Sequence, residues 1–74
     1  MQIKLSRHAK RRAKLYKIPE SVIIKILEGK ELSKGTHEII ENAVGFKYPL
    51  KIVITLEDDI IIVITNYPLK KGRK

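Results

Sequence analysis

The chain has 74 residues, carries a formal net charge of +8 at pH 7 and contains no cysteine. A chain of this length forms one domain at most, and the lack of cysteine excludes disulfides and thiolate metal sites. The excess of positive charge predicts an anionic partner, either a nucleic acid or an acidic protein. With two histidines and no recognisable ligand spacing, the sequence predicts no metal site and no cofactor.

The apolar residues favour a protein of the cytoplasm. No stretch approaches the roughly 18 apolar residues of a membrane-spanning helix, and no long apolar run follows the first charges. We therefore expect no membrane partner and no signal peptide. Aliphatic side chains dominate the apolar set, since only 5% of the residues are aromatic. An Ile- and Lys-rich composition without cysteine is typical of thermophilic proteins.

The first half of the chain is predicted to form a strand followed by two helices. Residues 1–5 alternate in polarity as a strand does, and Ser6 is suited to cap a helix over residues 7–16. Pro19 favours the first turn of a second helix, which ends at Gly29. The second helix has a wide apolar face, made of Val22, Ile23, Ile26 and Leu27.

The second half is predicted to form strands. Residues 36–44 fit a strand or a short helix, and we favour a strand because the later strands need an edge partner. Residues 50–57 and 60–67 alternate and are rich in β-branched side chains, as two strands of a hairpin are. The expected fold is α+β in the order β-α-α-β-β-β: an N-terminal strand, then two helices packed on one face of a three-stranded antiparallel sheet. Residues 1–74 then form a single domain, with a mobile basic tail over residues 69–74.

The hairpin turn at Asp58 and Asp59 decides which side chains share a face of the sheet. A two-residue turn would pair the apolar face of residues 50–57 with the odd-numbered residues of the last strand. A three-residue, bulged turn would pair that face with the even-numbered ones. We favour the bulged turn because it separates a helix-packing face from a polar one, and Asp tolerates the left-handed conformation that it needs. The polar face would then comprise Lys51, Thr55, Thr65 and Tyr67.

The first predicted helix opens with a pattern that can carry chemistry, Ser-Arg-His-Ala-Lys-Arg-Arg from Ser6 to Arg12. His8 and Arg12 are four residues apart and therefore neighbours on the helix surface. A neutral imidazole can act as a general base, and an arginine can hold a phosphate through two hydrogen bonds. The alternative is that His8 packs near the helix start while Arg12 forms a surface ion pair.

Other basic and aromatic residues are candidates for binding a nucleic acid. Tyr67 can stack on a base or donate a proton, and Lys51 can neutralise a phosphate. The alternative is an ordinary strand-end tyrosine and a solvated, solubilising set of lysines. The predicted phosphate-binding residues are Lys10, Arg11, Lys14 and Lys17 on the first helix and Lys70, Lys71 and Arg73 in the tail.

The chain resembles a family of small proteins with a Ser/Lys-x-His-Ala-x-x-Arg signature, similar to the RelE/ParE/BrnT superfamily of toxin-like proteins. The match covers nearly the whole chain. It departs from the pattern at Tyr16, where relatives often carry a second arginine, and at Lys17, which takes the place of a glycine. The residues that carry the resemblance are His8, Ala9, Arg12, Ile18, Val53, Thr65 and Tyr67.

The resemblance implies a compact α+β fold and metal-independent RNA cleavage, in which a ribose 2′-OH attacks the adjacent phosphate. It implies His8 as the base or acid, Arg12 and Lys51 as the groups that stabilise charge, and Tyr67 as proton donor or stacking partner. It also implies RNA or the ribosome as the target and an acidic antitoxin as a partner that covers the basic surface. Because the superfamily includes members that do not cleave RNA, the alternative is a non-catalytic basic module for nucleic acid or an acidic protein.

Overall fold

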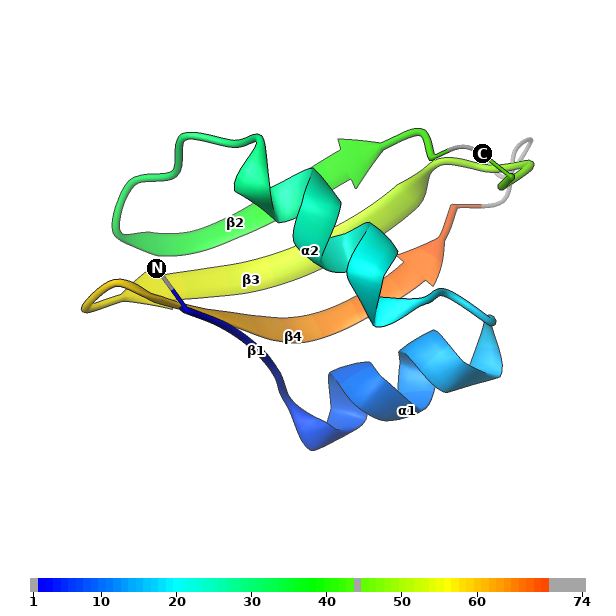
Figure 1. Ribbon diagram of the computed structural model, residues 1–74. Helices are drawn as coiled ribbons and strands as arrows, with labels where there is room; N and C mark the ends of the chain where they lie inside the picture. Colours follow the sequence, from blue (N-terminus) through cyan, green and yellow to red (C-terminus); the bar gives the residue numbers. More distant parts are fainter. Residues whose placement is uncertain (1, 44, 70–74) are drawn as a thin grey trace.

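The computed structural model describes residues 2–43 and 45–69. It contains a four-stranded sheet with two helices packed on one face (Figure 1). The described elements are β1 (Gln2–Leu5), α1 (Arg7–Leu15), α2 (Glu20–Glu28), β2 (Gly35–Glu41), β3 (Leu50–Glu57) and β4 (Ile60–Pro68). The predicted class and order of elements are confirmed, including the strand expected within residues 36–44. Most of the predicted basic tail, with Lys70, Lys71 and Arg73, lies outside the described residues.

The sheet has the order β1-β4-β3-β2. The strands from β2 to β4 are antiparallel, as predicted, and β1 joins them as a fourth strand parallel to β4. In this register Ile3 lies beside Ile61 and Leu5 beside Val63. The alternation of the first strand therefore continues the apolar face of the sheet. Neither helix of the described ranges has the length and apolar character needed to cross a membrane.

The core lies between the helices and this apolar face. α1 contributes only alanines, Ala9 and Ala13, and these small side chains let the helix lie close against β4. α2 contributes the larger Ile23 and Leu27. Burying an aliphatic side chain of that size stabilises a fold by about 1.5–3 kcal/mol. The buried apolar residues of the strands are Ile39, Leu50, Ile52, Ile54, Leu56, Ile61 and Val63.

The link between the helices is a tight turn at Lys17, whose φ is +58°. The N–H of Lys17 donates to the carbonyl of Lys14 at 3.2 Å, and the N–H of Ile18 donates to the carbonyl of Ala13 at 2.8 Å. This pair of bonds is the Schellman arrangement, which usually places glycine at the left-handed residue. Ile18, buried in the core, then directs the chain toward α2.

The turn between β3 and β4 differs from the predicted one. Asp58 and Asp59 have φ values of +50° and +66°, and Glu57 pairs directly with Ile60. The turn therefore has two residues, and the prediction of a three-residue turn is wrong. Two successive left-handed residues give a turn whose twist matches that of the strands, which favours this short connection.

The extra residue expected in the turn lies instead inside β4. Ile54 pairs with Val63, whereas Val53 pairs with Thr65, so Ile64 forms a β-bulge. A bulge inverts the alternation of the strand beyond it, and the end of β4 therefore presents its odd-numbered residues to the uncovered face. Lys51, Thr55, Thr65 and Tyr67 do share the uncovered face, as predicted, but through the bulge and not the turn. Before the bulge the prediction is wrong: Ile61 and Val63 face the helices, and Ile62 lies on the uncovered face beside Thr55.

Candidate functional site

The first turn of α1 is held against the bulged end of β4 by two polar side chains. Ser6 Oγ accepts a hydrogen bond from the N–H of Ala9 at 3.0 Å and donates to the carbonyl of Ile64 at 3.1 Å. Asn66 is fully buried, and its Nδ2 donates to the carbonyl of Ala9 at 3.1 Å. Because Ser6 and Ala9 flank His8, these contacts hold the backbone around His8 against the bulged part of β4, at Ile64 and Asn66.

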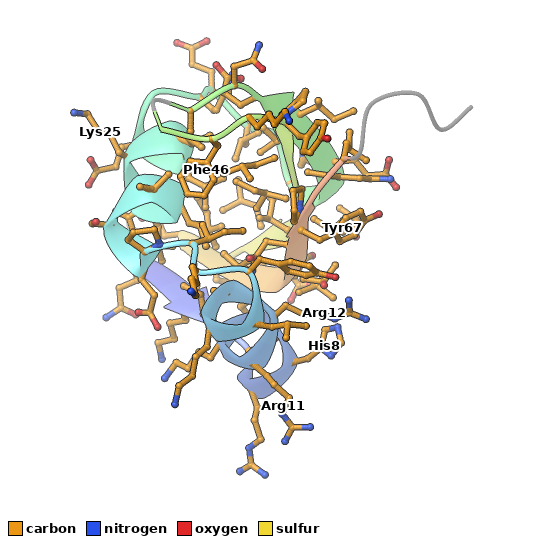
Figure 2. All side chains as sticks on the ribbon, turned by 90° about the vertical axis from the view of Figure 1, so that its right-hand side faces the viewer. His8, Arg11, Arg12, Lys25, Phe46 and Tyr67 are labelled. Atoms are coloured by element: carbon orange, nitrogen blue, oxygen red, sulfur yellow. The ribbon has the colours of Figure 1, made fainter. Side chains whose placement is uncertain are left out.

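His8 and Arg12 project from the same side of α1, and Tyr67 lies on that side of the molecule (Figure 2). His8 is exposed, so it does not pack into the core. Arg12 is half-buried, and its Nη1 donates to the hydroxyl of Tyr16 at 3.4 Å. Tyr16 thus orients the guanidinium from the position where the resemblance leads us to expect a second arginine.

Lys51 and Tyr67 lie opposite each other on β3 and β4. The Nζ atom of Lys51 is 6.0 Å from the centroid of the Tyr67 ring, within range of a cation–π interaction. It is also 3.3 Å from Oε1 of Glu38 on β2. The hydrogen bond and negative charge of Glu38, with a smaller contribution from Tyr67, raise the pKa of Lys51 above its usual value. The ammonium is therefore charged at neutral pH and already has an anionic partner.

The surface of α1 carries no acidic side chain, because residues 1–19 contain no Asp or Glu. Ion pairs within residues 2–43 and 45–69 join only Lys30 to Glu41 and Lys51 to Glu38, so no carboxylate contacts a basic residue of α1. Figure 2 shows Arg11 projecting in a different direction from Arg12. We call the exposed set the α1 basic surface: Arg7, Lys10, Arg11, Lys14 and Lys17.

Within the described residues, no group of three or more His, Asp or Glu side chains could hold a metal ion. A depression of about 330 Å³ lies between α2 and the end of β2. Lys25, on its rim, is on the opposite side of the molecule from Tyr67 (Figure 2). The depression is therefore separate from the side that carries His8 and Arg12.

Two residues of this region were missed by the sequence analysis. Glu38 alternates with apolar neighbours on β2, but only the pairing of β2 with β3 brings it to Lys51. Asn66 lies between Thr65 and Tyr67 at the polar end of β4, and nothing in its local sequence marks it as buried. Its inward direction follows from the bulge, which the local pattern does not reveal.

Comparison of the chain with protein-family models, with curated proteins and with solved structures gives no match. Its function is therefore inferred from the residues and the geometry described above.

Proposed function

We propose that this protein binds RNA through the α1 basic surface and cleaves it, without a metal ion, on the side that carries His8, Arg12 and Tyr67. The observation that supports the proposal is the docking of the first turn of α1 on the bulged end of β4. Because of it, His8, Arg12 and Tyr67, from distant parts of the chain, lie on one side of the molecule, next to a basic helix without acidic residues.

The proposed reaction needs only these side chains and the RNA. The neutral imidazole of His8 accepts the proton of a ribose 2′-OH, the 2′ oxygen bonds to the adjacent phosphorus, and the bond from phosphorus to the 5′ oxygen breaks. The leaving 5′ oxygen takes a proton from the hydroxyl of Tyr67. Arg12 and Lys51 stabilise the negative charge on the phosphate oxygens. The products are a 2′,3′-cyclic phosphate and a 5′-hydroxyl end.

The purified protein tests this proposal with single-stranded RNA in the presence of EDTA. We expect the wild type to cleave and His8→Ala to lose roughly a hundredfold or more of the rate, since general acid–base groups contribute about 10²–10⁴. His37→Ala is the matched control: its ring is 2.7 Å from the carbonyl of Ser33, on the helix-covered face of β2. Cleavage by His8→Ala at the wild-type rate would exclude the role given to His8.

The proposed partner is an acidic antitoxin that covers the α1 basic surface and prevents RNA from binding. The net charge of +8 and the absence of acidic residues from residues 1–19 support a partner of this charge. Expression of the wild type in growing cells is then expected to arrest growth and fragment RNA, and co-expression of the acidic partner to restore growth.

A second candidate is a non-catalytic module that binds nucleic acid or an acidic protein. Two observations favour it: Arg12 is engaged by Tyr16, and Lys51 is engaged by Glu38. It predicts RNA binding that weakens steeply with salt, with no cleavage and with unchanged affinity in His8→Ala. The EDTA-containing assay described above therefore separates the two candidates.

A further inference from the structure

The ammonium of Lys51 meets a carboxylate on the uncovered face of the sheet. Glu38 reaches it diagonally between β2 and β3, because the direct partner of Glu38 is Val53. The two charged atoms are 3.3 Å apart, and the side chain of Glu38 is 62% exposed while that of Lys51 is 22% exposed. The carboxylate is therefore the more accessible member of the pair.

A carboxylate and a phosphate are alternative partners for the same ammonium. Both offer anionic oxygens to its three N–H donors. The contact with Glu38 therefore reduces the free energy that a phosphate contact with Lys51 contributes to binding. An ion pair this accessible is weak, and an incoming anion can replace it. Tyr67, which lies opposite Lys51 across the strands, would then be next to the phosphate.

We propose that Glu38 is a built-in competitor for the phosphate at Lys51 and thereby limits the affinity of this site for RNA. The inference rests on the proposed function, which assigns Lys51 to the RNA phosphate. Removing the charge of Glu38 frees Lys51, adds one phosphate contact, and makes RNA binding both tighter and more dependent on salt.

Glu41 provides a matched control on the same strand. It also pairs with a lysine, since Lys30 Nζ is 2.7 Å from its Oε1. Its side chain lies on the face of β2 that also carries the buried Ile39, opposite to the face that carries Glu38. Glu41→Gln therefore changes the net charge as Glu38→Gln does but leaves the contact of Lys51 intact.

The experiment measures the binding of a labelled single-stranded RNA oligonucleotide over a range of KCl concentrations. At low salt, Glu38→Gln is expected to bind roughly three- to fivefold more tightly than Glu41→Gln, the range that an exposed ion pair allows. Its plot of log Kobs against log salt is expected to be steeper by about 0.7, the value for one more phosphate contact. Adding Lys51→Met to Glu38→Gln is expected to remove both the gain in affinity and the steeper salt dependence.

Three results would overturn the inference while RNA binding itself is retained. They are equal affinities and salt slopes for the two single variants, a gain that survives Lys51→Met, and weaker binding by Glu38→Gln than by Glu41→Gln. The last would mean that Glu38 orients Lys51 for the phosphate. If no variant binds RNA, the proposed function fails as well, so the two failures are distinguishable. Thermal unfolding of each variant checks that the fold is retained.

Discussion

At the scale of single residues, Lys17 adopts a backbone conformation that is unfavourable for a residue with a side chain. Its φ of +58° lies in the left-handed region, where a residue with a Cβ is strained and glycine is not. The strain persists because Ile18 must enter the core directly after α1 ends.

Lys17→Gly is therefore expected to increase the free energy of unfolding by about 1 kcal/mol. Denaturation in urea, followed by far-UV circular dichroism, measures the change. Lys14→Gly is the control: Lys14 is exposed within α1, and glycine there is expected to cost about 1 kcal/mol. If both variants were destabilised equally, the turn at Lys17 would not be strained.

At the scale of elements, the β3–β4 hairpin is connected by two aspartates that both have positive φ. Turns of this kind favour Asn-Gly or Asp-Gly, because glycine at the second position has no Cβ to strain. Asp59→Gly is therefore expected to raise the free energy of unfolding by roughly 0.5–1 kcal/mol and the melting temperature by a few degrees.

Calorimetry of Asp59→Gly measures this change, and Glu57→Gly is its control. Glu57 is exposed at the end of β3, where glycine weakens a strand. A lower melting temperature for Asp59→Gly would show that Asp59 contributes an interaction beyond its backbone conformation.

Asn66 is the buried polar side chain that joins β4 to α1. Its Nδ2 donates to the carbonyl of Ala9, while its Oδ1 is buried without a hydrogen-bond partner. Asn66→Ala is expected to lower the free energy of unfolding by about 1–3 kcal/mol, the usual cost of losing a buried hydrogen bond.

Hydrogen exchange locates the effect of Asn66→Ala. We expect exchange to accelerate more for the amides of α1 than for those of β3. In this variant α1 loses its hydrogen bond to Asn66, while the backbone hydrogen bonds of the sheet remain. Thr65→Ala, one residue earlier on the uncovered face, is expected to leave α1 unchanged. Equal acceleration in α1 and β3 would mean that Asn66 supports the core as a whole.

At the scale of the whole molecule, charge is distributed unevenly. The acidic residues follow residue 19 in the sequence, whereas α1 and its flanks carry only basic ones. A polyanion is therefore expected to approach along α1, and each phosphate contact contributes to the salt dependence of binding.

Changing Lys10, Arg11 and Lys14 together to glutamine is expected to reduce the salt slope of RNA binding by about 2. Fluorescence anisotropy at several KCl concentrations measures this slope. The control changes three lysines outside α1, Lys25, Lys34 and Lys47, and therefore removes the same charge. Equal losses in the two triple variants would mean that net charge alone, and not the α1 basic surface, attracts the RNA.

The sequence by itself determined the order and type of the elements. Alternation at β3, the β-branched run of β4, the cap at Ser6 and the alanine stripe of α1 are local signals, and local backbone preferences decide such features. The basic character of α1 is also local, since it depends only on which residues the helix contains. The roles of His8 and Arg12 remain predictions, because no local signal and no match to a known protein tests them.

Only the tertiary structure decided how the elements meet. The parallel pairing of β1 with β4, the bulge at Ile64 and the contact of Glu38 with Lys51 all join residues far apart in the chain. The bulge shows the physical reason. Up to Val63, the odd-numbered residues of β4, Ile61 and Val63, lie against the helices, and one unpaired residue then lets Asn66 reach α1 while Tyr67 faces outward. Such a shift depends on which elements pack against each face of the strand. The sequence pattern of a single strand carries no information about those elements.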